Sequence, residues 1–490
     1  MKTNVSSLGQ GPGLAWKRGS SSFPPGLAYL QEWTGGKTEP VGPSWPDDLT
    51  FKQWSTIGWA ITDDGVLCIK PWSGDTGETG WATTRGAVPW SYQRSKIKKV
   101  ESTGSIVLNE HSGFLFCDCS SLTDLTALAG WNVSKVTNMS SMFQSCRKLA
   151  DLTALTHWNV SNVTNMSSMF YGCSSLTDLT ALAEWNVSNV KSMDSMFSYC
   201  SSLTDLTALA EWNVSNVTRM DSMFSGCSRL NDLDALRHWS ASNVTRMDSM
   251  FKGCSSLTDL TALAGWNVSE VKNMDSMFFS CSSLNDLTGL RAWSVSNVTS
   301  MSGMFYGCSR LTDLHGLEDW NASEVTNMGS MFSSCSSLTD LTVIKDWDVS
   351  SVTNMSSMFY SCSRLTDLTP ISGWNASEVT NMSSMFYGCS NLTDMTALKE
   401  WNVSSVTNMS SMFSGCSSLQ RIGIPSIANG GQNLVKNAEA AKLTTVLPSI
   451  ISEDGSMGPL AWDELNTEMT TNPDAFQDGT VWVKAEEEAQ

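Results

Sequence analysis

Cysteine recurs along this chain at a constant step of 27 residues. Twelve cysteines keep this step from Cys119 to Cys416, and eleven tryptophans keep it from Trp131 to Trp401. A fixed period of this length is typical of a chain built from stacked copies of one supersecondary unit. Such a solenoid presents a long, regular surface and rarely builds a unique buried pocket. We therefore expect a protein that binds rather than one that catalyses.

The residues within one repeat, 173–199, predict how a single coil is built. Its first half carries leucines three residues apart (Leu176, Leu179 and Leu182), and its second half continues the spacing with Val190, Met193, Met196 and Phe197. The Met-Phe part suits a single helical turn, and the glycine that precedes cysteine in many repeats fits a left-handed exit from it. The sequence predicts an α/β repeat solenoid of the leucine-rich-repeat type, with short strands and one helical turn per coil. Each coil is too short to bury its own apolar edge, so stacking must bury it.

Four segments follow from the change of pattern along the chain. Residues 1–44 are rich in Gly, Pro and Ser and are expected to form a flexible leader. In 45–118, Asp64-Gly65 separates two apolar runs, which predicts a hairpin within a β-rich N-terminal cap. The eleven repeats occupy 119–418, and 419–490 is expected to form a C-terminal cap and an acidic tail.

The composition excludes some classes of partner. The net charge is −18, and residues 451–490 hold ten acidic residues against one lysine. Nucleic acid is not an expected partner, because phosphate binding needs a basic face. The sequence contains no run of 18 apolar residues, so we expect no membrane-spanning helix. Lys2 is not followed by an apolar segment, so no secretory signal is predicted.

The string 158–176, Trp-Asn-Val-Ser-Asn-Val-Thr-Asn-Met-Ser-Ser-Met-Phe-Tyr-Gly-Cys-Ser-Ser-Leu, closely resembles the repeats of the BspA-like leucine-rich-repeat surface proteins of bacteria. The resemblance covers about 119–418. It implies a solenoid at the cell surface or outside the cell, associated with adhesion and with contact to a host or matrix, and it implies no enzymatic activity. A phage particle or the cytoplasm is the alternative location, since no signal or anchor is visible.

In a solenoid, equivalent residues of successive coils form a column, in which neighbouring residues lie about 4.8 Å apart. The cysteine column is expected to consist of buried free thiols, with disulfides or metal binding as alternatives. The Met-Phe column is expected in the core. The tryptophan column is expected to cover the edge of the core, with partial exposure for ligand contact as the alternative.

A column of aspartates runs from Asp124 to Asp394 with the same step. Stacked like charges repel, so we expect hydrogen bonds from Ser, Thr or backbone N–H groups of the next coil, with calcium between coils as the alternative. The many Asn-x-Ser/Thr triplets are interpreted as hydrogen-bond ladders and turn caps. No cofactor is predicted.

The repeats differ mainly in two positions, both expected to face solvent. One precedes tryptophan, and the other follows Met-Phe. The second holds the candidate partner-binding residues Tyr171, Lys252, Phe279, Tyr306, Tyr360 and Tyr387. Exposed tyrosine is a common anchor at interfaces. We expect these residues to contact a protein or a glycan on a host cell, in a matrix or on a neighbouring subunit.

Three classes of function remain at this stage. The first is a non-enzymatic binding or adhesion solenoid, which the repeats favour. The second is a structural component of a phage particle or another assembly. An enzyme is not expected, because no phosphate loop, nucleophile elbow or Cys-His pair outside the repeats is present.

Overall fold

The computed structural model describes residues 43, 45–423, 450–452 and 481–484. The predicted leader therefore lies outside the described residues, except for Pro43. Most of the predicted C-terminal cap and acidic tail, 419–490, also lies outside them.

The first described segment forms two small sheets. One sheet has the order β1 (Lys52–Trp54), β2 (Ile57–Ile61), β3 (Val66–Pro71), β5 (Lys99–Ser102). The other pairs β4 (Thr76–Glu78) with β6 (Ser105–Val107) in parallel, and the short 3₁₀ helix η1 (Arg94–Lys96) precedes β5. Strands β2 and β3 are antiparallel and pair Ile61 with Leu67 across the Asp64-Gly65 turn, which confirms the predicted hairpin. The sheet leads into the coils through a bridge between Lys99 and Asp124.

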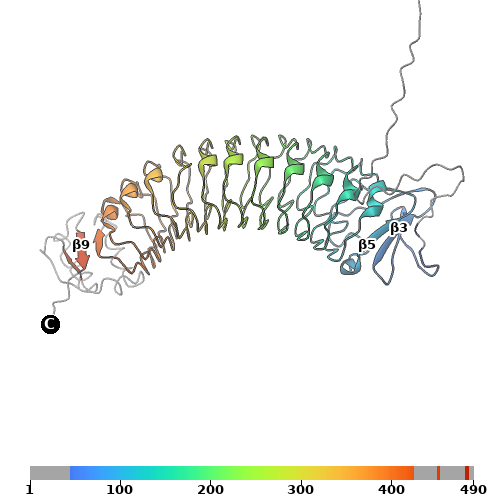
Figure 1. Cartoon of the computed structure of the whole chain (residues 1–490), viewed down its shortest axis with the longest axis horizontal. Helices are drawn as coiled ribbons and strands as arrows, with labels where there is room; N and C mark the ends of the chain where they lie inside the picture. Colours follow the sequence, from blue (N-terminus) through green and yellow to red (C-terminus); the bar gives the residue numbers. More distant parts are fainter. Residues whose placement is uncertain (1–42, 44, 424–449, 453–480, 485–490) are drawn as a thin grey trace, which may run out of the picture. The chain divides into compact units, whose positions relative to one another are not determined.

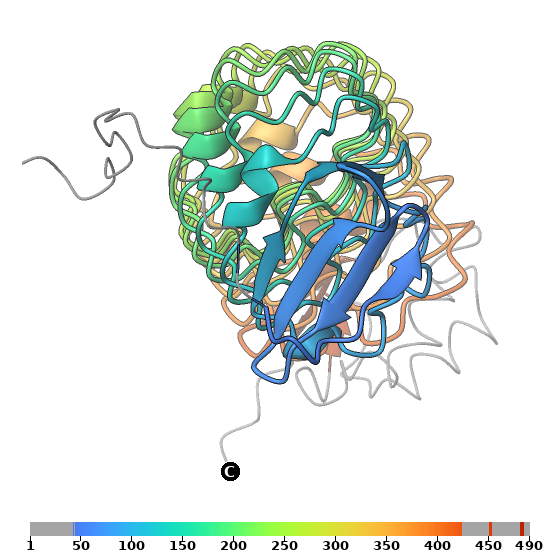
Figure 2. The same cartoon turned by 90° about the vertical axis from the view of Figure 1, so that its right-hand side faces the viewer.

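The following residues form stacked coils (Figure 1). Most coils contain one short helical turn of the 3₁₀ type. These turns are η2 (Thr126–Gly130), η3 (Thr153–Leu155), η4 (Thr180–Leu182), η5 (Thr207–Leu209), η6 (Asp234–Leu236), η7 (Thr261–Leu263), η8 (Thr288–Leu290), η9 (Thr342–Ile344), η10 (Thr369–Ile371) and η11 (Thr396–Glu400). Seen along the stack, they lie above one another in one row (Figure 2). The predicted repeat solenoid is confirmed.

The position of the helical turn within the coil differs from the prediction. It lies at the Thr-Ala-Leu segment and not at Met-Phe. The Met-Phe segment is instead a run of tight turns, in which the N–H of Tyr171 donates to the C=O of Ser168 and the N–H of Cys173 to that of Phe170. Apolar residues three apart fit either arrangement, because both close hydrogen bonds between residues i and i+3. The predicted strand is reduced to one parallel bridge per coil, such as Asn138 with Asn165.

The turn run joins each coil to the next through its backbone. The N–H groups of Met166, Ser168, Phe170 and Gly172 donate to carbonyls of the following coil over 2.7–3.0 Å. Two residues of each run are left-handed, for example Ser168 at φ 56° and Gly172 at φ 71°. Glycine tolerates this conformation without steric cost, which confirms the predicted left-handed glycine before cysteine.

The inward columns of Leu, Val, Met, Phe and Cys form one continuous core from the first sheet to Leu419. The phenylalanine rings of neighbouring coils stack in parallel with centroids 5.5–5.9 Å apart along this core. Met166, Met169 and Phe170 are fully buried, as are their equivalents in most coils. The Met-Phe column is therefore core, as predicted.

Tryptophan and cysteine each bond to the preceding coil. The indole N–H of Trp266 donates to the C=O of Leu236 over 2.9 Å, and the same bond recurs from Trp158 to Trp401. The thiol of Cys254 donates to the C=O of Phe224 over 3.3 Å, and this bond recurs from Cys146 to Cys416. Because these hydrogen bonds recur, tryptophan and cysteine must each stand at the same position in every coil.

At the other end, β7 (Arg421–Gly423), β9 (Val481–Lys484) and β8 (Ile450–Ser452) form an antiparallel sheet in that order. Arg421 also bridges Asp394 of the last coil in parallel, so this sheet extends the stack at its C-terminal edge.

Replacing Trp266 by Phe removes the indole N–H and leaves a smaller ring in the core. The carbonyl of Leu236 keeps its bond from the N–H of Trp239, so we expect the unfolding free energy to fall by about 1–3 kcal/mol. A lower urea midpoint would report this loss. Trp72→Phe is the control, because Trp72 is 47% exposed, and its midpoint should not change. Equal shifts for both variants would contradict the role of the bond.

Candidate functional site

The side chains of the turn runs that do not enter the apolar core line a surface that we call the turn face. In the coil of Phe197 it consists of Ser192, Asp194, Ser198 and Tyr199, and in every other coil of the equivalent residues. Most coils have Ser, Asn or Gly at three of these four positions, and the position that follows Met-Phe varies most.

The predicted partner-binding residues form one column of this face, the aromatic column, at the position that follows Met-Phe. Phe279 and Tyr306 stack in parallel with centroids 4.3 Å apart, and the ammonium of Lys252 lies 4.6 Å from the centroid of Phe279. Tyr360 and Tyr387 form a second stack with centroids 4.6 Å apart. The structure thus brings five of the six candidates into two groups, one of three and one of two.

These side chains are half-buried, so they face solvent only in part. The rings cover one another, and they lean toward the next coil: a Cβ at Gly303 would lie 3.6 Å from Cδ2 of Phe279. Where serine stands in the column it is buried, at Ser198, Ser225, Ser333 and Ser414. The position before tryptophan is exposed in the coils, as predicted.

The sixth candidate, Tyr171, pairs with a residue that the sequence did not indicate. Its ring meets that of Tyr199 edge to face, with centroids 5.4 Å apart. Partial burial and the neighbouring Tyr199 raise the pKa of Tyr171. Tyr199 is 53% exposed and has a φ of 59°. Its only signal in the sequence is that a tyrosine stands where most other coils have Gly or Ser before cysteine.

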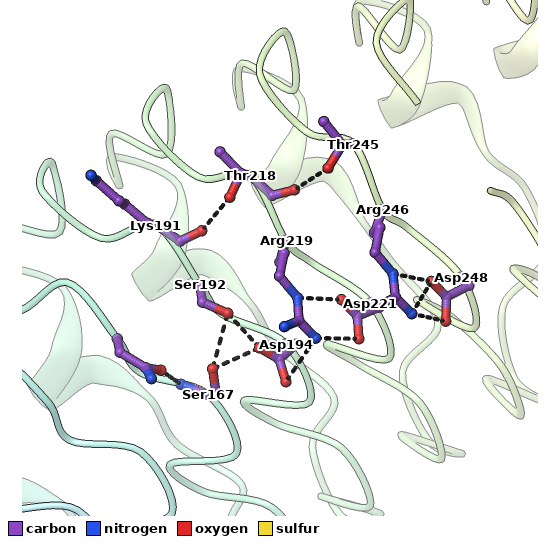
Figure 3. A network of polar contacts seen from close by, with 11 residues as sticks. Ser167, Lys191, Ser192, Asp194, Thr218, Arg219, Asp221, Thr245, Arg246 and Asp248 are labelled. Atoms are coloured by element: carbon purple, nitrogen blue, oxygen red, sulfur yellow. Dashed lines mark hydrogen bonds and ion pairs between the residues drawn. The ribbon is translucent and has the colours of Figure 1, made fainter. Parts of the chain in front are cut away.

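A charged ladder lies on the turn face in three successive coils (Figure 3). It consists of Asp194, Arg219, Asp221, Arg246 and Asp248. The guanidinium of Arg219 lies 3.3 Å from the carboxylate of Asp221 and 3.8 Å from that of Asp194. Arg246 lies 3.1 Å from Asp248. The sequence reasoning missed this ladder, whose signal was Arg and Asp at positions that hold Asn and Ser elsewhere.

The negative and positive charges of the ladder largely neutralise one another. The hydroxyl of Ser167 donates to the carboxylate of Asp194 over 2.6 Å, and that of Ser192 donates to the same carboxylate. Half-buried ion pairs of this kind contribute little to stability, so their value lies in fixing the shape and charge of the surface.

The remaining columns are structural. Tryptophans of the repeats are 1–5% exposed, which places them in the core edge and not in ligand contact. Aspartates of the long column accept hydrogen bonds from backbone N–H groups of the same coil and not of the next one, and Asp394 also pairs with the guanidinium of Arg421 in the following strand. The N–H of Thr180, for example, donates to Asp178 over 2.8 Å, because the carboxylate caps the 3₁₀ turn that follows. Among the described residues no group of His, Cys, Asp or Glu could hold a metal ion.

The asparagine triplets act as predicted, as turn caps and ladders. The side-chain oxygen of Asn165 accepts the N–H of Ser167 over 2.9 Å, and the amide of Asn162 donates to the C=O of Ser134 in the preceding coil. No helix in the described part of the chain has the length and apolar character needed to cross a bilayer.

All fourteen cysteines are free and buried, as predicted for the repeats, and not paired in disulfides. Burial raises the pKa of Cys227, Cys281 and Cys335 to about 12, because a thiolate would lose its hydration in the core. The thiols are therefore neutral donors to backbone carbonyls and not nucleophiles.

At pH 8 we expect a thiol-specific reagent to label none of the cysteines in the native protein. All fourteen should react once the chain is unfolded in guanidinium chloride. Mass spectrometry of the labelled chain counts the modified thiols. Fast labelling of any repeat cysteine under native conditions would contradict the buried column.

The raised pKa values also predict how stability depends on pH. A cysteine in the unfolded chain ionises near pH 8.5, below the pKa of about 12 that Cys227 and Cys281 have when folded. The contribution of these thiols is complete below pH 8.5 and is lost as pH rises toward 12. Urea midpoints should therefore fall from pH 9 upward, and less steeply in a variant with Cys227→Ala and Cys281→Ala. Identical slopes would contradict this origin.

Three bacterial repeat proteins of known structure are among the weak matches to this chain. A leucine-rich repeat protein from Eubacterium ventriosum ATCC 27560 is 16% identical, with a TM-score of 0.34 over 74% of this chain and 93% of that chain. One from Bacteroides ovatus ATCC 8483 is also 16% identical, with a TM-score of 0.32 over 77% and 93%. A leucine rich cell surface protein from Faecalibacterium prausnitzii A2-165 is 18% identical, with a TM-score of 0.27 over 65% and 94%. Likenesses this weak support no conclusion about function.

No curated protein matches the chain. The repeats, however, match a known family in four overlapping stretches, 113–233, 204–315, 231–337 and 310–425, which together span more than half of the 490 residues. The predicted resemblance to bacterial repeat proteins is thereby confirmed at the level of the repeat family. The chain belongs to the family described as "Mycoplasma protein of unknown function, DUF285".

Proposed function

We propose that this protein is a non-enzymatic binding module that recognises a protein partner through its turn face. The observation that carries this proposal is the aromatic column, in which five of the six candidate residues form two preassembled groups. Groups of this kind supply contact area with little side-chain entropy left to lose, because the rings already hold one another in place.

The chemistry of the column suits recognition. Tyrosine is enriched among the residues that dominate binding energy, since it combines a large apolar ring with a polar tip. The two stacks are separated by a single serine, Ser333, so each presents its own set of ring edges and hydroxyl groups to a partner.

We further propose that the module is displayed on a bacterial cell and acts in adhesion, which the resemblance of its repeats supports. Fractionation of the native source tests this location. Recovery in the envelope fraction or the medium supports it, and recovery in phage particles would favour a structural component instead.

Replacing Tyr306, Tyr360 and Tyr387 together by Ser should abolish partner binding, because it removes one ring from the first stack and the whole of the second. Pull-down from host extracts and a glycan array with the wild-type chain first define the ligand. The triple variant should then show no detectable binding, which corresponds to an affinity at least roughly 10-fold lower.

The fold should survive this change, since serine already stands in the column in other coils. Circular dichroism and the urea midpoint check that. The matched control replaces Glu184, Glu211 and Glu400, which are exposed before tryptophan, by Ser. Unchanged affinity of the tyrosine variant would overturn the proposal, and capture of glycans alone would replace the protein partner by a sugar.

A further inference from the structure

We infer that Tyr199, with Tyr171 beside it, is an anchor for a lysine or arginine side chain of a basic partner segment. This inference rests on the proposed function, because it names a second contact on the same turn face and the chemistry that this contact selects. It concerns a residue that lies outside the aromatic column.

The first observation is the backbone conformation of Tyr199. Its φ of 59° lies in the left-handed region, which costs a bulky residue roughly 1–2 kcal/mol. The equivalent positions of the other repeats hold Gly or Ser with the same sign of φ, such as Gly172 and Ser280, and Asp118 stands there before the first cysteine of the column. The tyrosine is therefore the exception at this position in the size of its side chain and not in its backbone conformation.

The coil contacts do not require the tyrosine. The N–H of Tyr199 donates to the C=O of Ser225 over 2.6 Å, and the N–H of Gly172 makes the same bond to Ser198 over 2.7 Å. A glycine or serine would therefore hold the coils together equally well, and the side chain must be explained by something else.

The second observation is the placement of the ring. A Cβ at Gly226 in the next coil would lie 2.7 Å from Cδ1 of Tyr199, so the ring occupies space that only a glycine leaves open. The ring meets Tyr171 edge to face and is still 53% exposed. It is the one large hydrophobic side chain in the described coils that is more than a third exposed. The pair thus offers a held, solvent-facing ring.

Two observations indicate what binds to it. Within this chain, the side chain that lies over a ring of the neighbouring aromatic column is a cation, Lys252 above Phe279 at 4.6 Å. The residues from 158 to 238, the coils around Tyr199, contain eight acidic and four basic residues, and the whole chain carries −18. The negative potential attracts cations, and the exposed face of a tyrosine binds them by the cation–π interaction. Anionic segments are disfavoured for the same reason.

The experiment uses the full-length chain and three fluorescein-labelled peptides, octalysine, octaarginine and octaglutamate. Fluorescence anisotropy measures each affinity at 50 and 300 mM NaCl. We expect the two basic peptides to bind and octaglutamate not to bind. Tyr199→Ser and Tyr199→Leu should each weaken binding of the basic peptides roughly 3-fold or more, whereas Tyr199→Phe should retain it, since a phenyl ring keeps the π face.

The leucine variant separates recognition from packing, because it keeps an apolar side chain in place without a π face. Its urea midpoint is measured beside that of Tyr199→Ser. Tyr92→Ser is the control for a ring that is fully exposed in the first described segment, and it should leave the affinity unchanged.

Equal affinity of Tyr199→Leu and wild type for both basic peptides would overturn the inference, because binding would then reflect net charge alone. Retention of binding at 300 mM NaCl by wild type but not by Tyr199→Leu would support it. The proposed function is tested separately by the aromatic-column variant against the native partner. Loss of binding there, with no effect of Tyr199→Leu, would end this inference and leave the function standing.

Discussion

The side chains of tryptophan and cysteine hold each coil to the preceding one by donating a hydrogen bond to a backbone carbonyl there. That carbonyl already accepts a backbone N–H from its own coil. The carbonyl of Leu236 accepts the N–H of Trp239 from its own coil and the indole N–H of Trp266 from the next. The carbonyl of Phe224 does the same for the N–H of Cys227 and the thiol of Cys254. Both acceptors are buried, where a hydrogen bond is stronger than in water. A smaller apolar residue in place of tryptophan or cysteine would have no N–H or S–H group, so the second lone pair of the carbonyl would remain without a hydrogen bond. This explains why these two residue types recur in every coil.

The inward half of the structure was predictable from the sequence because repetition assigns each residue to a column. The core of Leu, Met, Phe and Cys, the left-handed glycines and the asparagine caps all follow from spacing and residue type. The helical turn was misplaced because spacing by three does not distinguish a 3₁₀ turn at Thr180–Leu182 from consecutive tight turns at Met193–Phe197.

The outward half was less predictable, because it depends on how side chains of adjacent coils meet. Spacing alone does not reveal that Phe279 and Tyr306 stack and shield each other, nor that Arg219 bridges two carboxylates of different coils. The sequence did not indicate Tyr199, because its position varies only between small residues in the other repeats. Its exposed ring beside Tyr171 becomes visible only in the structure.

The tryptophan and cysteine bonds each reach only as far as the adjacent coil, and this has a consequence for how such a chain can change. Deleting or duplicating 27 residues would join two surfaces that already fit, since every coil offers the same carbonyls and receives the same donors. The stack at Phe279–Tyr306 and the stack at Tyr360–Tyr387 would then move apart or together by one whole step, with the rest of the molecule intact. Unequal recombination between near-identical repeats in the gene would therefore change the distance between the two binding groups by whole coils. The fold of each coil would stay the same.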